Sequence, residues 1–200
     1  QTETRKIVLD TTLPTITINL PTNNSFTSDT LQNINFTVAD ANLNTCWYSN
    51  DTMTANTTLT NCQTNITTVT WSEGNHNVTV YVNDSANNVN SSKITFTIDT
   101  TFPTLTFANP TTNSSNLSQN FIQANLSFSD TNLGTANISL FNSTRNIINS
   151  TQGTTSPLFI NFTGLSDGTY YLNATINDTA GNKNQTETRT IGLDRVAPNL

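Results

Sequence analysis

Positive charge and histidine are both scarce in this sequence. Seven Lys and Arg stand against 13 Asp and Glu, which leaves a net charge of −6. Nucleic-acid binding needs a cationic surface, so this balance argues against it. The one histidine, His76, falls on the core phase of an alternating segment, which predicts a packed residue rather than a catalytic base. No glycine-rich phosphate loop follows a strand pattern. We therefore predict that the chain is not an enzyme.

Long apolar runs and cysteines are scarce as well. No apolar run approaches the ~18 residues of a membrane-spanning helix, so no membrane span is predicted in this sequence. Cys46 and Cys62 are the only cysteines. A single pair fits one disulfide and an oxidising compartment, and two buried free thiols are the alternative. We expect the disulfide and an extracellular location.

Asparagine, threonine and serine are abundant, with 33, 42 and 17 residues. A polar chain is typically disordered when its net charge is high and its β-branched residues are few. Here the net charge is low, while Thr, Ile and Val, which favour strands, are plentiful. The composition therefore predicts extensive strands around a small core.

Two repeats are nested in the chain. Residues 1–10 (QTETRKIVLD) return at 185–194 as QTETRTIGLD, with eight of ten positions identical. Inside this long repeat, LDTTLP at 9–14 returns as IDTTFP at 98–103, and EGNHNVTVYVNDSANN at 73–88 returns as DGTYYLNATINDTAGN at 167–182. Repetition at a fixed period is typical of arrays.

The repeats predict four segments. Residues 11–99 and 100–194 are expected to be homologous domains, the first with the cysteines. Residues 1–10 read as the last strand of a preceding repeat, and residues 195–200 as the start of the next. The sequence thus resembles a window on a longer repeating protein.

Apolar residues alternate with polar ones in both domains. Ile34, Phe36 and Val38 share one phase, as do the valines at alternate positions of 78–82. This period of two indicates antiparallel strands with one buried face. Turn residues separate about seven short strands in each domain. We predict an all-β chain of two tandem Ig-like antiparallel β-sandwich domains. Trp71 is expected in the core.

The opening DTTxP and the later GxYxLxAxxNDxAGN give the domains a family likeness. A domain with these motifs resembles the Ig-like repeats of prokaryotic cell-surface proteins. The stretch CWYSND at 46–51 is most similar to repeats of large archaeal surface proteins. The resemblance implies a cell-surface location and covers nearly the whole chain. Two departures are the NDSANN of the first domain, which lacks the usual Gly, and the absence of cysteine from the second.

Glycosylation sequons, Asn-x-Ser/Thr, occur at about twice the frequency of random placement. Asn35, Asn77, Asn125, Asn137 and Asn173 lie on the outward phase of predicted strands, as a glycan requires. Asn/Thr-rich composition is the alternative explanation, but we predict N-linked glycans at several sites. The candidate sites are Asn23, Asn35, Asn50, Asn56, Asn65, Asn77, Asn83, Asn90, Asn113, Asn116, Asn125, Asn137, Asn142, Asn149, Asn161, Asn173, Asn177 and Asn184.

Six aspartates end strands at equivalent places in the two domains. Because the second and sixth strands of an Ig-like sandwich exit at the end that receives the incoming chain, we expect two triplets to converge there. Three carboxylates with nearby Asn oxygens can hold Ca²⁺. Side-chain turns at strand ends are the alternative role. Paired carboxylates can also cleave a glycosidic bond, but a role at the domain linkers explains these six aspartates better. The triplets are Asp10, Asp40 and Asp84, and Asp99, Asp130 and Asp178.

Two non-catalytic functions remain. A binding site needs an exposed aromatic or charged cluster. The candidates are Tyr48, Tyr81, Phe141 and Tyr171, with Tyr81 and Tyr171 outward and expected to lack aromatic neighbours. We therefore favour a structural segment of a surface fibre, stalk or layer that joins copies of the repeat. The alternative is an adhesin module that binds cell-surface glycans or proteins.

The join between copies can be made in two ways. In a covalent array, residues 1–10 complete the preceding domain. In a non-covalent filament they could insert into a neighbour as a donated strand. Residues 185–194 should already fill that slot in this chain, which favours the covalent array.

Overall fold

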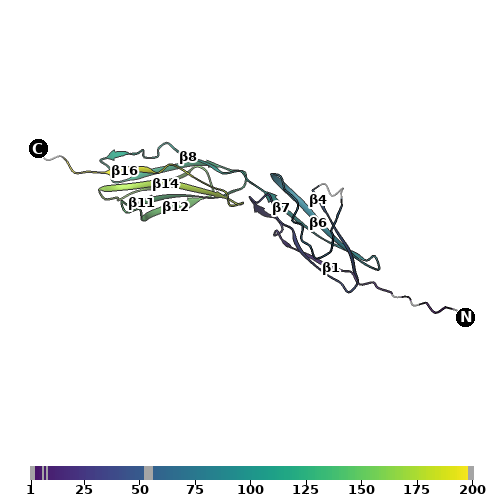
Figure 1. The fold of residues 1–200 in the computed structure, drawn as a ribbon. Coiled ribbons are helices and arrows are strands. Elements are labelled where there is room, and N and C mark those ends of the chain that lie inside the picture. The colour runs from purple at the N-terminus through teal and green to yellow at the C-terminus, as the bar shows by residue number, and fades with distance from the viewer. Residues whose placement is uncertain (1–2, 6, 8, 52–55, 198–200) are drawn as a thin grey trace. The chain divides into compact units, whose positions relative to one another are not determined.

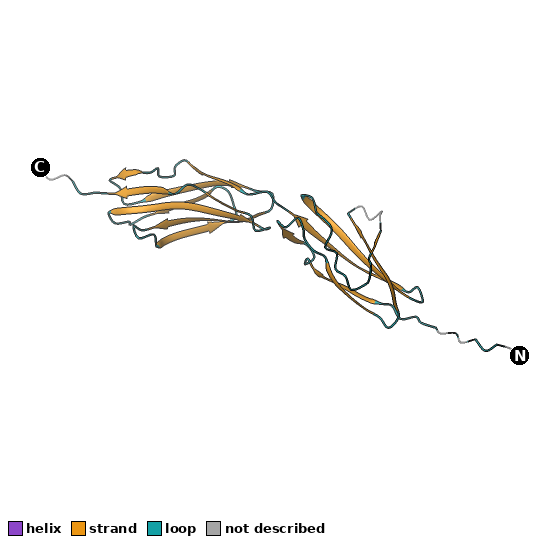
Figure 2. Ribbon diagram, in the orientation of Figure 1, coloured by secondary structure: helices purple, strands orange, loops and turns teal. Residues whose placement is uncertain are grey.

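The chain folds into two compact units, residues 1–100 and 101–200 (Figure 1). The computed structural model describes residues 3–5, 7, 9–51 and 56–197. Throughout these ranges the secondary structure consists of strands, with no helix (Figure 2). Accordingly, no helix that could cross a membrane is found in the described part of the chain. The boundary between the units lies one residue after the predicted end of the first domain.

The first unit contains two sheets. One pairs β1 with β3, and the other has the order β2-β7-β6-β4-β5. All pairs are antiparallel except β2 with β7, which is parallel. Its strands are β1 (Thr15–Leu20), β2 (Ser25–Thr27), β3 (Asn35–Ala39), β4 (Leu43–Asn50), β5 (Thr57–Thr58), β6 (Gly74–Asp84) and β7 (Val89–Ile98).

The core of the first unit lies between these sheets, on the phase that the alternation predicted. Ile34 and Phe36 are buried from one side, and Val78 and Val80 from the other. Trp71 is buried as predicted, and its indole N–H donates to the carbonyl of Gln32 at 2.8 Å.

The second unit repeats the plan with more strands. One sheet has the order β13-β10-β8, and the other β12-β11-β14-β16-β9, with β15 also paired to β14. Again one pair, β16 with β9, is parallel. The strands are β8 (Thr104–Ala108), β9 (Ser115–Leu117), β10 (Ile122–Ser129), β11 (Leu133–Phe141), β12 (Ile147–Gly153), β13 (Leu158–Phe162), β14 (Gly168–Asp178), β15 (Lys183–Gln185) and β16 (Arg189–Leu193).

The second core also follows the alternation. Leu126 and Phe128 on β10 face the even-numbered residues 170–176 of β14. The last strand, β16, adds Ile191 and Leu193, which are 0% and 2% exposed. Two sandwiches of mainly antiparallel strands, one in each unit, confirm the predicted fold class.

Candidate functional site

The end of β6 forms a turn built on one buried carboxylate. The backbone N–H groups of Ala86 and Asn88 each donate to Asp84 Oδ1 at 2.8 Å, and the Asn88 side-chain amide donates to Oδ2 at 2.7 Å. Asn87 adopts a left-handed backbone with φ 67°. Asparagine tolerates this conformation better than most residues, which explains how the first domain manages without the usual Gly.

The Asn88 side chain also ties the incoming chain to this turn, because its amide donates to the carbonyl of Asp10 at 3.0 Å. The second unit builds the same turn. Asn182 donates to Asp178 through its backbone at 2.8 Å and its side chain at 2.7 Å, and Gly181 has φ 93°. In both units the NDxAxN motif therefore shapes the turn at this end of the sandwich.

Burial of the Asp84 carboxyl raises its pKa, but the hydrogen bonds from the Asn88 side chain and the backbone N–H groups of the turn outweigh burial. They hold the Asp84 pKa below its ordinary value. Because the folded pKa is lower than the unfolded one, this group stabilises the first unit above the unfolded pKa. That stability is lost as the pH falls through the folded pKa.

We expect the parent chain to lose more stability than Asp84→Asn as the pH falls below the ordinary aspartate pKa of about 3.9. The variant has no carboxyl at this position to protonate. Denaturant unfolding of the first unit at each pH measures the difference. Equal losses in the two proteins would show that the turn does not depend on the Asp84 charge.

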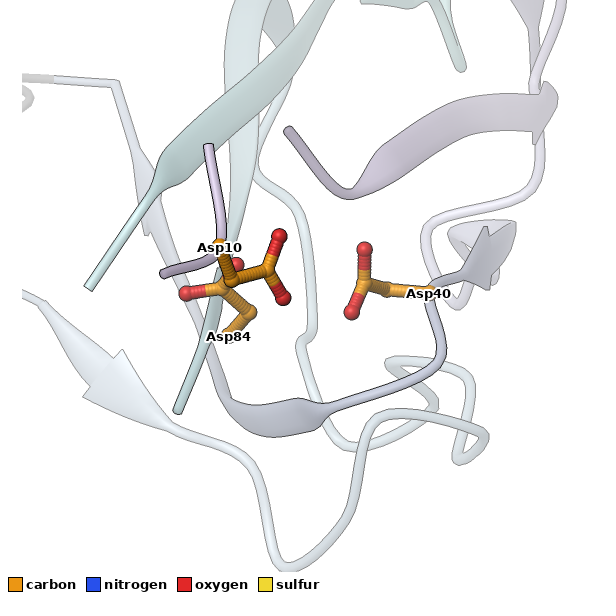
Figure 3. A group of neighbouring side chains, drawn as sticks. All are labelled: Asp10, Asp40 and Asp84. Carbon is orange, nitrogen blue, oxygen red and sulfur yellow. The ribbon is translucent and has the colours of Figure 1, made fainter. Parts of the chain in front are cut away.

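Three carboxylates of the first unit converge beside this turn, as predicted (Figure 3). One oxygen each from Asp10, Asp40 and Asp84 lies within 4.8 Å of the others, and the Asp40 side chain points toward the other two. Each carboxylate also accepts local hydrogen bonds. Asp10 accepts from the Thr12 N–H at 3.0 Å, and Asp40 from the Asn42 N–H at 2.7 Å. The group is thus both turn-forming and rich in anionic oxygen.

The members of the second predicted triplet belong to different units. Asp130 follows β10 and Asp178 ends β14 in the second unit, whereas Asp99 follows β7 in the first. Asp130 accepts from the Asn132 N–H at 2.7 Å, which repeats the Asp40 turn.

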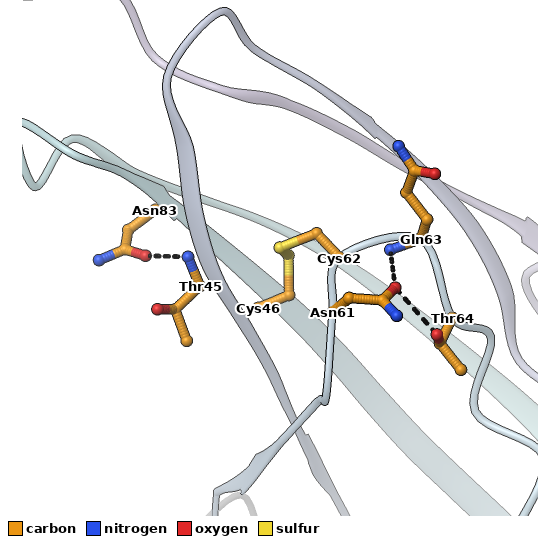
Figure 4. Close-up of a disulfide and its surroundings, with 7 residues drawn as sticks. All are labelled: Thr45, Cys46, Asn61, Cys62, Gln63, Thr64 and Asn83. Carbon is orange, nitrogen blue, oxygen red and sulfur yellow. Dashed lines mark hydrogen bonds between the residues drawn. A yellow bond between two sulfur atoms is a disulfide. The ribbon is translucent and has the colours of Figure 1, made fainter.

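The two cysteines form a disulfide, as predicted (Figure 4). Cys46 lies on β4, and Cys62 follows β5, the strand that pairs with β4. Their Cα atoms are 5.1 Å apart. The bond therefore anchors the segment after β5 to the edge of its own sheet and does not join the two sheets. Asn61 shapes that segment by accepting from Gln63 and Thr64.

His76 is a packed residue, as predicted. It is 4% exposed and lies against the rings of Trp71 and Phe96, with centroids 5.1 and 5.6 Å away. Its ring nitrogens contact Asp51 Oδ1 at 3.0 Å and the carbonyl of Ser72 at 2.8 Å.

The prediction that the outward aromatic residues lack aromatic neighbours is wrong. Tyr81 stacks on Trp47 across β4 and β6, with centroids 5.4 Å apart and planes 4° apart. Tyr171 pairs across the strands with Phe141, and the Arg145 guanidinium lies 3.7 Å from its ring centroid. The register between neighbouring strands brings these aromatic residues together. The residue pattern of a single strand does not reveal that register. The fourth candidate, Tyr48, is buried in the core.

The sequons differ in how free their amides are. Asn125 lies on the outward phase, yet its amide N–H donates to the carbonyl of Asn109 at 2.8 Å and its Oδ1 is buried. Asn137 Oδ1 is also buried. An outward phase therefore does not guarantee a free amide. Asn184 is exposed, but its amide also donates, to the Pro103 carbonyl at 2.9 Å. The other well-exposed sequon residues are Asn23, Asn56, Asn65, Asn113, Asn116, Asn149 and Asn161.

We expect the intact mass of native protein to exceed the sequence mass by several hexose-sized units. Thr163→Ala, which removes the sequon of exposed Asn161, should lower the intact mass of the native protein by one glycan in addition to the mass change of the substitution. Ser127→Ala, which removes the sequon of Asn125, should change the intact mass only by the mass difference between serine and alanine. A native sample at the bare sequence mass would rule glycosylation out.

The leading segment and β16 have nearly the same sequence but opposite environments. Ile7 and Leu9 are 90% and 87% exposed, whereas their counterparts Ile191 and Leu193 are core residues. None of the described residues among 1–10 is in a strand. Nearly the same sequence thus lies in solvent in the leading segment and in the core in β16.

The sequence matches no protein-family model and no curated protein sequence. Among solved structures, the fibronectin(III)-like modules of Clostridium thermocellum CbhA match with a TM-score of 0.58 and 15% identity, over 90% of this chain and 94% of theirs. The chicken CNTN1 FN1–FN3 domains match with a TM-score of 0.48 and 11% identity, over 95% of this chain and 70% of theirs.

A tetra-tandem repeat from the extending region of a large adhesion protein matches with a TM-score of 0.41 and 19% identity, over 92% of this chain and 50% of that one. At these identities the likeness shows the fold alone. The evidence for the fold is the CbhA match, whose TM-score is 0.58. The chain has the fold of tandem β-sandwich domains of the fibronectin III and Ig-like kind.

Proposed function

We propose that the chain is a structural repeat of an extracellular surface fibre, stalk or surface layer, and that it joins copies of the repeat end to end. One observation carries the proposal. Ile7 and Leu9 are exposed in a segment whose near-copy is the last core strand of the second unit. Pairing with another sandwich would bury these side chains, as a strand added to a sheet does.

Other features support an extracellular, non-catalytic role. Disulfides persist in oxidising compartments, and N-linked glycans on exposed sequons would shield the sheet faces from proteases and from unwanted strand pairing. His76 and both cysteines are engaged in packing and bonding, so the histidine and the thiols have structural roles in the first unit.

Electron microscopy of material from the cell surface tests the proposal. We expect threads or a layer with a regular repeat. Dispersed single copies under native conditions would contradict the joining of copies.

Calcium binding at Asp10, Asp40 and Asp84 stays a prediction. At the affinity of extracellular modules, 10 mM Ca²⁺ would stabilise the first unit by about 1.4–2.7 kcal/mol. Asp40→Asn should abolish this response, and Asp29→Asn, outside the triplet, should keep it. If EDTA and Ca²⁺ leave the melting temperature unchanged, the triplet acts only through its turns.

Adhesion is a second candidate, favoured by the Trp47–Tyr81 stack and the Arg145–Tyr171 pair. Aromatic faces of this kind recur in protein and sugar recognition. A glycan and surface-protein binding screen with Tyr81→Ala, Tyr171→Ala and the control Phe159→Ala separates the functions. Binding that only the first two variants lose would favour the adhesin.

A further inference from the structure

The chain that enters the first unit is fastened to the hairpin after β6. The Asn90 side-chain amide donates to the Pro14 carbonyl at 2.8 Å. The Asn88 amide donates to the Asp10 carbonyl at 3.0 Å. Pro14 directly precedes β1, which pairs with β3 in one sheet, whereas Asn90 lies on β7 of the other sheet. These two asparagines, here named the asparagine clasp, therefore tie the entrance of one sheet to the other sheet.

The second unit has the same clasp at the equivalent positions. The Asn184 amide donates to the Pro103 carbonyl at 2.9 Å, and Pro103 directly precedes β8. The Asn182 amide, which is buried, donates to the Thr101 carbonyl at 3.3 Å. Because both units fasten the entering chain in this way, the clasp belongs to the plan of the repeat and not to one surface.

The chain that leaves each unit is held by an acidic residue. In the first unit Glu73 Oε2 accepts from the Thr100 N–H at 2.9 Å and from the Thr100 hydroxyl at 2.7 Å. In the second unit the Asp167 carboxylate accepts from the Arg195 N–H at 3.2 Å and from the Arg195 guanidinium at 2.6 Å. Thr100 and Arg195 each lie two residues beyond the last strand of their unit. We name Glu73 and Asp167 the acid clasps.

The two kinds of clasp lie at opposite ends of one strand in each unit. The acid clasp directly precedes β6 or β14, and the asparagine clasp follows that strand after the Asp84 or Asp178 turn. Both strands have 11 residues and lie at the centre of their sheets. Each unit thus connects the entering chain to the leaving chain through one central strand.

A central strand resists a pull better than the entrance strand does. Cross-strand hydrogen bonds run perpendicular to the strands, so a pull along β6 loads its bonds to β7 and β4 together. The entrance strand β1 pairs only with β3, and a pull on its first residue would peel it away bond by bond. The asparagine clasp lies before β1, so it meets the load first.

We propose that β6 and β14 are the tension-bearing strands of the repeat. Tension from a preceding copy enters through the asparagine clasp, passes along the central strand, and leaves through the acid clasp to the next unit. The proposal rests on the proposed joining of copies end to end, because only joined copies transmit tension. It adds the route that the tension takes inside each unit.

Single-molecule pulling at constant force tests the route on the full-length, unglycosylated chain with its disulfide formed. The force is applied between the first and last residues. Because the disulfide keeps the loop of 16 residues from extending, unfolding of the first unit lengthens the chain by about 50 Å less than unfolding of the second. The length of each step therefore identifies the unit that unfolds.

We expect Asn90→Ala to speed unfolding of the first unit about 2–10-fold at the same force and to leave the second unit unchanged. Asn184→Ala should do the reverse. Glu73→Ala, which removes the acid clasp of the first unit, should act on that unit only. Asn75→Ala, at an exposed position of β6 outside both clasps, should unfold like the parent chain.

A second pulling geometry separates load from stability. A handle at Thr22, an exposed residue between β1 and β2, sends the force into the first unit without crossing the asparagine clasp. In this geometry Asn90→Ala should unfold at the parent rate.

Two results would overturn the proposal. Equal acceleration by Asn90→Ala from both handles would show that the bond adds only to general stability. No acceleration with the terminal handle would show that the clasp carries no load. Either result removes the load route alone, whereas dispersed single copies in electron micrographs would remove the joining of copies.

Discussion

Ile191→Ala should lower the free energy of unfolding of the second unit by about 2–5 kcal/mol, while Ile7→Ala leaves both units unchanged. Ile191 is fully buried on β16, in a core shared with Leu172 and Ile138. Its truncation removes transfer free energy and leaves a cavity. Ile7 is 90% exposed in the chain alone, so its truncation removes no packing.

Denaturant unfolding, with exchange of β14 amides as the readout of the second unit, measures both variants. The pair is matched, because the two isoleucines occupy the same position of nearly identical segments. A large loss from Ile7→Ala in the isolated chain would show that the leading segment already packs against the first unit.

The second large effect is expected at the disulfide. Reduction, or replacement of Cys46 and Cys62 by serine, should destabilise the first unit by about 3 kcal/mol, because the bond closes a loop of 16 residues. The released segment holds Ile66, which bridges Ile34 and is buried in the core, so the effect reaches the sandwich interior.

The second unit serves as an internal control for this experiment. Both tryptophans, Trp47 and Trp71, belong to the first unit, so their fluorescence reports that unit. The second unit has no cysteine, and its stability should not change with reductant. An unchanged unfolding midpoint of the first unit under reduction would contradict a stabilising disulfide.

The strands and cores were predictable because burial of one face imposes a period of two. The positions at 34–38 and 170–176 carry that period without interruption. The convergence of Asp10, Asp40 and Asp84 was also predictable, since the exits of the second and sixth strands share one end of an Ig-like sandwich.

Contacts between strands were not predictable, because they depend on register. The Trp47–Tyr81 stack requires the pairing of β4 with β6, which no single strand specifies. The engaged amide of Asn125 depends on the loop that brings the Asn109 carbonyl beside β10. Likewise, the position of Gly192 opposite Asn116 follows from a parallel pair between segments far apart in the sequence.

The most direct test of the joining role is hydrogen exchange at residues 3–10, compared between the isolated chain and the native surface assembly. We expect fast exchange in the isolated chain and at least about 100-fold slower exchange in the assembly, where the segment would be a core strand of another sandwich. Equally fast exchange in both samples would contradict the account.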